Sequence, residues 1–187
     1  MHIITISGSR SGVGKTRLAT LLLARLTGFS AIKVTRDDLL VSVTDDPAVI
    51  DEPGKDTYLL KRAGAEKVVW IRTGERDLSD CLSLAFDMLT GAKGVIVEGN
   101  SAAGRLSAQR LEALLSFFVA GADMELKPGA DALLKKADVV VVDTGPDAPP
   151  DDVVAVIRRH NPSAFVTTFA EMENPAPEIL AALARIT

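Results

Sequence analysis

The chain of 187 residues contains one cysteine, Cys81, and only two histidines, His2 and His160, which lie far apart in the sequence. A single cysteine cannot form an internal disulfide, so we expect a reducing, cytoplasmic compartment. Structural zinc sites draw their ligands mainly from cysteine and histidine. The scarcity of both residue types therefore argues against a zinc cluster.

Long apolar runs and strong charge of one sign are also absent. No apolar stretch approaches the ~20 residues that a membrane-spanning helix needs. The first residues, "HIITISG", have the pattern of a strand rather than that of a charged leader. The formal net charge is −4, with acidic and basic residues intermixed. The composition thus predicts neither a nucleic-acid partner nor a membrane partner.

Apolar residues make up 47% of the chain, which predicts a single globular domain over residues 1–187. The run "ADVVVVDTG" is apolar on both faces, as in a central strand of a parallel sheet. Strands alternate with helices, which predicts a three-layer α/β fold with a mostly parallel sheet of about seven strands. The expected strands are His2–Ser7, Ser30–Thr35, Lys67–Arg72, Gly94–Glu98, Leu115–Ala120, Asp138–Asp143 and Ala164–Thr168, and the clearest helices are Lys15–Leu26, Leu78–Leu89, Ser107–Leu114, Ala130–Lys136, Pro150–Arg159 and Pro175–Ile186.

Residues 36–56 interrupt this alternation, because the segment contains seven acidic residues and only two basic ones, Arg36 and Lys55. The segments "LLVSV" and "AVI" flank a turn at "TDDP", which predicts a small hairpin-like excursion. One interpretation is an exposed acidic loop. We favour a functional loop, because segments that follow parallel strands border the ligand crevice.

The first expected strand leads into "GSRSGVGKT" and then into a helix, which is the context of a phosphate-binding loop. The strict spacing would place the first glycine at residue 9, which is Ser9, so Gly8 makes this loop one residue longer. In such a loop Lys15 reaches the β- and γ-phosphates of a nucleoside triphosphate, and the Thr16 hydroxyl binds Mg²⁺. The alternative is an ordinary glycine-rich turn. The residues expected to cradle the nucleotide are Gly8, Ser9, Gly12, Val13, Gly14, Lys15, Thr16 and Arg17.

Within this loop, "SGVGKT" resembles the MinD/ParA and dethiobiotin synthetase branch of P-loop proteins. Loops of the MinD type carry a second, signature lysine five residues before the main one, and Arg10 occupies that position here. Arg10 either contacts a phosphate, across a dimer interface or during phosphoryl transfer, or is a solvated loop residue.

Several acidic residues are candidates for the metal or for the attacking water. Glu98 ends an apolar strand, where it binds Mg²⁺ together with Thr16 or faces solvent. Asp37 and Asp38 follow another strand, and only one of them can point inward along an extended chain. We favour Asp37 for the metal and for positioning water, with Asp56 as a further candidate.

Asp143 ends the "VVVVD" run, where a loop that recognises the base would begin. Its carboxylate could accept hydrogen bonds from guanine, or it is a plain loop residue. A complete N-K-x-D motif is absent, so the sequence leaves GTP and ATP both open.

Three further stretches, "IKVT", "DEPGKDTYLLKRAGAEKV" and "VIVEG", together with the loop, resemble the molybdopterin-guanine dinucleotide biosynthesis accessory (adapter) family. The matching positions are Ile32-Lys33, Asp51 to Thr57, Ala63 to Ala65, and Val97 to Gly99. The resemblance implies a cytoplasmic, often dimeric GTP-binding protein that hydrolyses nucleotide slowly and assists a partner enzyme.

Three functions fit these features. The favoured one is an accessory protein for molybdenum-cofactor biosynthesis that binds Mg-GTP or Mg-ATP, with Lys15 and Arg10 stabilising charge and Asp37 positioning water. The second is a small-molecule kinase or ligase of the dethiobiotin synthetase type, in which Lys33 and Lys55 bind the substrate acid. The third, a ParA-like partitioning ATPase, lacks the basic face or amphipathic tail that such proteins use.

Overall fold

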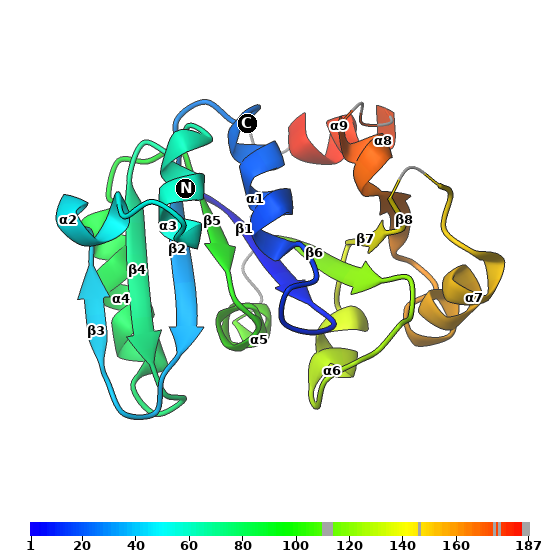
Figure 1. Ribbon diagram of the computed structural model, residues 1–187, viewed down its shortest axis with the longest axis horizontal. Helices are drawn as coiled ribbons and strands as arrows, with labels where there is room; N and C mark the ends of the chain where they lie inside the picture. The colour runs from blue at the N-terminus through cyan, green and yellow to red at the C-terminus, as the bar shows by residue number, and fades with distance from the viewer. Residues whose placement is uncertain (110–113, 146, 174, 176, 185–187) are drawn as a thin grey trace.

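The computed structural model describes residues 1–109, 114–145, 147–173, 175 and 177–184. An eight-stranded sheet forms its centre, with the strand order β3-β4-β2-β5-β1-β6-β7-β8 (Figure 1). Seven strands are parallel, and β3 pairs antiparallel with β4. The strands are β1 (His2–Gly8), β2 (Phe29–Arg36), β3 (Ser42–Thr44), β4 (Val68–Thr73), β5 (Gly94–Glu98), β6 (Leu114–Gly121), β7 (Val139–Asp143) and β8 (Phe165–Thr168).

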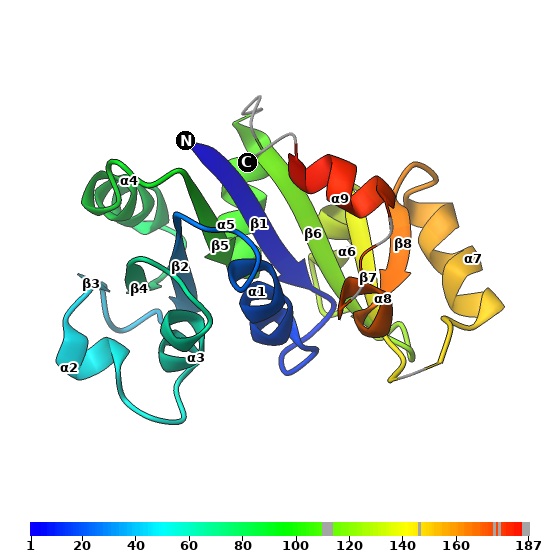
Figure 2. The same cartoon turned by 90° about the horizontal axis from the view of Figure 1, so that it is seen from above.

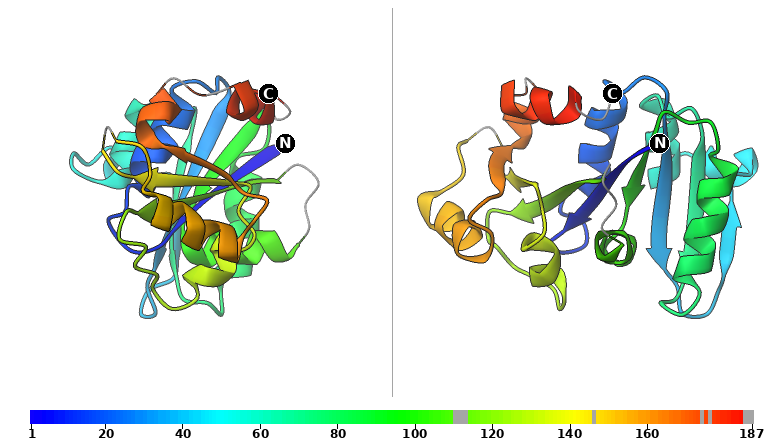
Figure 3. Two further views of the ribbon diagram at one scale, coloured as in Figure 1. Left: turned by 90° about the vertical axis from the view of Figure 1, so that its right-hand side faces the viewer. Right: turned by 180° about the vertical axis from the view of Figure 1, so that it is seen from behind.

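Helices cover both faces of the sheet, so the fold has three layers: helices, sheet and helices. Figure 1 and the right-hand view of Figure 3 show them from opposite sides, and Figure 2 shows them from above. The helices of the described residues are α1 (Lys15–Leu23), α2 (Pro47–Ile50), α3 (Asp56–Arg62), α4 (Leu78–Met88), α5 (Asn100–Ala108), α6 (Ala130–Leu134), α7 (Asp151–His160), α8 (Phe169–Glu173) and α9 (Pro177–Ala184). One face packs against α1, α3, α8 and α9. The other packs against α4 and α5 on one side and α6 and α7 on the other.

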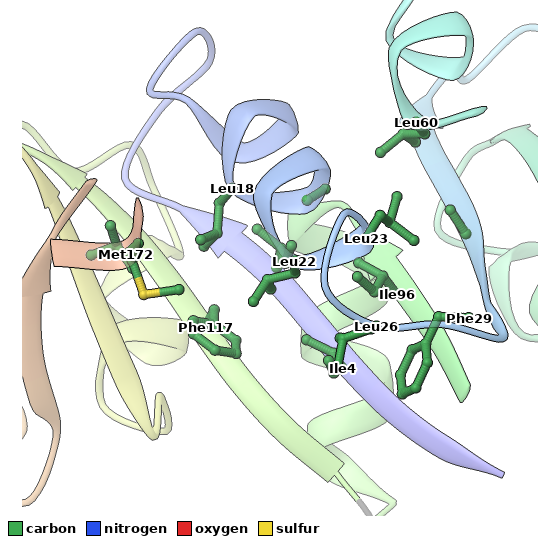
Figure 4. Packing of buried hydrophobic residues seen from close by; sticks show 14 of the residues in the cluster. Ile4, Leu18, Leu22, Leu23, Leu26, Phe29, Leu60, Ile96, Phe117 and Met172 are labelled. Carbon is green, nitrogen blue, oxygen red and sulfur yellow. The ribbon is translucent and has the colours of Figure 1, made fainter. Parts of the chain in front are cut away.

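The helix α1, which follows the glycine-rich loop after β1, is packed against the sheet by a buried apolar stripe. Leu18, Leu22 and Leu23 of α1 pack onto the sheet near Ile4 of β1 and Phe117 of β6 (Figure 4). The three leucines are at most 3% exposed, and full burial of each contributes about 2 kcal/mol. This packing fixes the start of α1, and hence the loop, against the centre of the sheet.

The fold class expected from the sequence is confirmed, and each of the seven expected strands occurs with ends within two residues of its expected range. The additional strand is the three-residue β3 at one edge of the sheet. Among the helices of the described residues, none has the length and apolarity that crossing a bilayer requires.

One expectation about the helices is wrong. The helix expected at 107–114 begins earlier, as α5 at Asn100, and Leu114 already belongs to β6, while residues 110–113 lie outside the described residues. Gly104 interrupts the apolar spacing inside α5 and lowers helix propensity, which hid the helix from pattern analysis. The helix expected at 175–186 is α9 in the described residues, whereas Asn174 and residues 185–187 lie outside them.

The expected hairpin in residues 36–56 is also wrong. Ser42–Thr44 form β3, but their partner is β4 rather than the "AVI" segment. Residues 48–50 belong to the short helix α2, because the Asp46 carboxylate accepts a hydrogen bond from the Ala48 N–H and Pro47 favours a helix start. Asp56 then opens α3, with an acid at its N-terminal end and Lys61 and Arg62 in its last turn, as the helix dipole favours.

Candidate functional site

The loop after β1 lies at the carboxyl edge of the sheet, which is the lower edge in Figure 1, next to the beginning of α5 and of α6. Gly12 and Gly14 adopt φ angles of 74° and 97°, which L residues other than glycine rarely adopt. A Cβ atom on Gly8 would lie 2.7 Å from Val13 Cγ1, and one on Gly14 would lie 3.0 Å from the Phe169 ring. The glycines at 8, 12 and 14 are therefore required by the backbone of the loop itself.

Hydrogen bonds hold the extra residue of the loop in place. The Ser9 N–H donates to the Val119 carbonyl at 2.8 Å, and the Ser9 carbonyl accepts from the Lys127 N–H at 2.9 Å. The side-chain amide of Asn100 accepts from the Gly8 N–H at 3.1 Å and donates to the Gly8 carbonyl at 2.8 Å. The lengthened loop is thus pinned to β6, to the start of α5 and to the segment before α6. Asn100 directly follows the Glu-Gly pair, but sequence reasoning did not single it out.

Lys15 is the cation of the loop. Its Nζ donates to the Arg10 carbonyl at 3.0 Å, which folds the side chain across the loop. Burial lowers the pKa of Lys15, and the charges of Lys127 and Lys33 lower it further, against the opposing attraction of Glu98 and Asp56. An ammonium group that is partly buried beside other cations gains from a bound anion, which is what a phosphate would supply.

Behind Lys15, four side chains form one polar network. The Thr16 hydroxyl donates to Glu98 at 3.1 Å (Oε1) and 3.0 Å (Oε2). Lys33 Nζ lies 2.6 Å from Glu98 Oε1 and 2.5 Å from Asp56 Oδ2. Lys33 and Glu98 are register partners on the parallel strands β2 and β5, and for this reason their side chains meet.

The two carboxylates of this network differ in how deeply they are buried. The Glu98 side chain is 2% exposed, that of Lys33 14%, and that of Asp56 48%. Burial lowers the pKa of Lys33, but attraction to Glu98 and hydrogen bonds to Asp56 and Glu98 outweigh this and hold its pKa above the usual value. Lys33 therefore stays charged and compensates the buried Glu98.

The hydroxyl and carboxylate oxygens of this network are the donor type that Mg²⁺ prefers. Thr16 keeps lone pairs for a metal while it donates its proton to Glu98. No cluster of three or more histidine, cysteine, aspartate or glutamate residues suited to a metal occurs in the described part of the chain. The residues thus fit Mg²⁺ in a mixed shell, in which Thr16 and Glu98 bind directly or through water and phosphate oxygens complete the coordination.

The other expected site residues lie away from this network. The Asp37 carboxylate accepts from the backbone N–H groups of Leu39 and Leu40 at 3.0 and 3.1 Å, and Asp38 pairs with Arg36. Lys55 lies 3.8 Å from Glu52. Asp56, rather than Asp37, is the aspartate beside Lys33 and Glu98.

Arg10 and Asp143 both form ion pairs outside the Thr16–Glu98–Lys33–Asp56 network. Arg10 pairs with Asp123 at 2.8 Å, and its Nε lies 3.7 Å from Glu125. Asp143 lies 3.8 Å from Arg17, whose guanidinium stacks on Phe169 with 4.3 Å to the ring centroid. Arg17 consequently links α1 to the end of β7 and to α8.

A cleft of about 980 Å³ opens around the loop and extends along α5 and α6. Seven basic and three acidic side chains line it, in a chain whose net charge is −4. Its lining comprises Ser11, Gly12, Gly14–Arg17, Lys33–Arg36, Asp56, Glu75, Glu98–Ser101, Gly104, Arg105, Ala108, Lys127–Gly129, Ala132, Leu133 and Lys136. Four of the residues expected to bind the nucleotide are not part of this lining: Gly8, Ser9, Val13 and Asp143.

No protein-family model and no curated protein matches this sequence. Solved structures do resemble it. HypB from Helicobacter pylori in complex with nickel is 17% identical over 99% of this chain and 87% of its own, with a TM-score of 0.57. Hydrogenase maturation factor HypB from Archaeoglobus fulgidus is 14% identical over 100% and 91% of the two chains, with a TM-score of 0.63.

A third solved structure, an LAO/AO transport system kinase, has a TM-score of 0.54 at 17% identity. All of this chain aligns with it, but only 59% of the kinase is covered. At these identities the likeness concerns the fold. The fold is that of a P-loop NTPase. The loop of the strand–loop–helix unit at residues 2–23 lies at the carboxyl end of a central strand, where open parallel α/β folds bind their ligands.

Proposed function

We propose that this protein binds a magnesium–nucleoside triphosphate, with GTP favoured over ATP, and hydrolyses it slowly as an accessory protein in cofactor biosynthesis. The observation that carries the proposal is the Thr16–Glu98 contact directly behind Lys15 at the start of α1. A hydroxyl for the metal, a buried carboxylate next to it and a lysine over the loop are the parts that a Mg²⁺-nucleotide site uses.

In this proposal each residue has a defined task. The backbone N–H groups at the start of α1 and the Lys15 ammonium bind the β- and γ-phosphates. Thr16 and Glu98 hold Mg²⁺, which neutralises charge on the phosphate oxygens when it is bound. Asp56, 48% exposed beside Lys33, is the carboxylate placed to orient a water. Asp143 remains the candidate for base recognition once Arg17 turns toward phosphate.

Slow hydrolysis is supported by the state of the acidic side chains. All three that line the described cleft lie in ion pairs with bases: Glu98 and Asp56 with Lys33, and Glu75 with Arg105. A carboxylate held by a cation is a weak proton acceptor. A partner that reorganises the Lys33 network would then accelerate turnover, as expected of an accessory protein.

Two observations support the proposed pathway: a resemblance in sequence and a similarity of fold. The stretches at Lys33, Asp51 to Thr57 and Glu98 resemble the molybdopterin-guanine dinucleotide accessory family, and Lys33 brings them together in space because it pairs with both Asp56 and Glu98. Solved structures of similar fold include a hydrogenase maturation factor. Both point to a protein that assists another enzyme, and we favour molybdenum-cofactor biosynthesis.

Thermal unfolding with Mg-GTP or Mg-ATP tests nucleotide binding. A ligand at a hundred times its Kd stabilises by ~2.7 kcal/mol, which corresponds to roughly 5–10 °C in Tm for a chain of this size. Lys15→Ala should abolish the shift, whereas Lys61→Ala, an exposed lysine on α3, should retain it. A shift of equal size in Lys15→Ala and wild type, or no shift with either nucleotide, would rule out the proposed site.

A homodimer that uses Arg10 is part of the same proposal. Arg10 is 40% exposed and bound to Asp123 within its own chain, so an exposed ion pair must open before it reaches a phosphate in a second copy. Light scattering with and without Mg-GTP would report dimer formation. Arg10→Ala should prevent a nucleotide-dependent dimer, and Arg159→Ala, whose guanidinium bonds only within α7 in the described structure, should not. An unchanged dimer in Arg10→Ala would exclude this role.

The second candidate function is phosphoryl transfer from ATP to a small acid. The size and basicity of the cleft favour it, since both exceed what a triphosphate alone requires. The discriminating measurement is nucleotide hydrolysis alone, with added small acids, and with a partner enzyme.

A further inference from the structure

The cleft continues well beyond the phosphate-binding loop, into a groove between α5 and α6. Ala108 ends α5 and still lines it, about 12 Å along the helix from Asn100. Ala132, Leu133 and Lys136 also line it, on the side of α6. In the proposed function the terminal phosphate of the nucleotide lies at the N-terminal end of α5, next to Glu98, so this groove is left for another molecule.

Small residues give the groove its shape. Gly104 stands at the centre of α5, and a Cβ atom added there would meet only Leu133 Cδ2, at 3.7 Å. Together with Ala108, Ala132 and Leu133, it makes an apolar floor. The packing of α5 and α6 thus does not fill the space above Gly104.

Basic side chains surround this floor. Arg105 lines it from α5 and Lys136 from the turn that follows α6, and Lys127 stands where the groove meets the glycine-rich loop. The Lys127 N–H donates to the Ser9 carbonyl, and its charge lowers the pKa of Lys15, which places it near both. Within the described residues Lys127 has no ion-pair partner, and Arg105 has only Glu75 at 3.6 Å.

We propose that the groove between α5 and α6 binds a second ligand, a small molecule that combines an apolar or aromatic body with a carboxylate or phosphate group. The body lies on the floor of Gly104, Ala108, Ala132 and Leu133. The anionic group lies toward Lys127 and Arg105, beside the terminal phosphate of the nucleotide. This inference rests on the proposed function for its first ligand, and it names the class of molecule that the same cleft takes as its second.

Anilinonaphthalene sulfonate is a suitable probe, because it is an aromatic body with one anionic group that fluoresces on binding. Wild-type protein saturated with Mg-GDP should bind one equivalent. Lys127→Ala and Arg105→Ala should each weaken binding about tenfold or more, the loss expected for one charge-assisted hydrogen bond. Gly104→Met, which places a side chain in the groove, should weaken it about tenfold or more. The control is Lys67→Ala, because Lys67 directly precedes β4, pairs with Asp45 and is not part of the cleft lining.

Displacement then identifies the anionic group. Competition by citrate assigns the site to carboxylates and competition by inorganic phosphate to phosphates, and either result supports the groove. Equal probe affinity in wild type, Gly104→Met and Lys127→Ala overturns it, as does absence of saturable binding. Each variant is used only if its Tm is not below that of wild type, with Gly104→Ala in place of Gly104→Met otherwise. The titration is repeated without nucleotide, so that failure to bind nucleotide and failure of the groove are separate results.

Discussion

Replacing Lys33 by methionine isolates the energetic role of the buried network. Methionine keeps much of the length of the side chain but removes its charge, which leaves Glu98, 2% exposed, with the Thr16 hydroxyl as its remaining described partner. Breaking a buried ion pair from one side costs about 3–5 kcal/mol. Asp56 is half-exposed and regains water, so only one carboxylate is stranded and the lower end, about 3 kcal/mol, is expected.

The chain provides a matched control in Lys61→Met. Lys61 lies 2.6 Å from Asp51, the same separation as Lys33 from Glu98, but the two side chains are 44% and 43% exposed. An exposed pair of this kind contributes about 0.2–1 kcal/mol. The two substitutions thus remove the same charge at the same distance; the sites differ in burial and in the half-exposed second partner of Lys33, Asp56.

Urea unfolding of both variants without nucleotide gives the comparison directly. With a urea m-value of about 2–3 kcal/mol/M, Lys33→Met should lower the midpoint by roughly 1–1.5 M and Lys61→Met by less than about 0.5 M. Adding Glu98→Gln to Lys33→Met should restore part of the loss, because a buried amide costs less than an unpaired carboxylate. If Lys33→Met lost no more stability than Lys61→Met, the argument from burial would be refuted.

Three further predictions follow from the same geometry. Gly14→Ala should cost about 1–2 kcal/mol in urea unfolding, because an L side chain at φ 97° is strained, and should remove the thermal shift with nucleotide; unchanged binding would contradict the loop assignment. Gly104→Ala should instead raise stability by about 0.5–1 kcal/mol, because helix propensity improves and the added methyl meets only Leu133. The stability that Lys33 contributes should be fully present below its unfolded pKa of 10.5 and disappear as pH rises through its higher folded pKa, so unfolding of wild type and Lys33→Met should converge only at strongly alkaline pH.

The sequence was sufficient for the fold, and it also picked out the residues that meet at the centre of the candidate site, because both depend on local patterns. The alternation of strands and helices predicted the layers, and Gly-Lys-Thr after a strand placed Lys15 and Thr16 where the structure has them. Glu98 was likewise predicted from its place at a strand end. Its contact with Thr16 follows from β1 and β5 being neighbours in the sheet.

The choice of aspartate depended on information that the sequence does not contain. Asp37 follows β2 directly and was favoured for that reason, but it closes a local turn with Leu39 and Leu40. Asp56 reaches the site because α3 starts there and because Lys33 and Glu98 are in register on neighbouring strands. Register and the direction of a returning chain are long-range properties, whereas proximity to a strand end is a local one.

The net charge of the chain gives the wrong impression of its cleft. The acidic residues that make the chain −4 overall lie largely elsewhere, and the three that line the cleft are each held by Lys33 or Arg105. The basic side chains of the cleft that are not neutralised in these pairs leave a concave surface with an excess of lysine and arginine. Concave surfaces with charge of one sign focus the field and attract counter-ions. An acidic protein can therefore attract anions at one place, and the glycine-rich loop and the groove beside it share this local excess of positive charge.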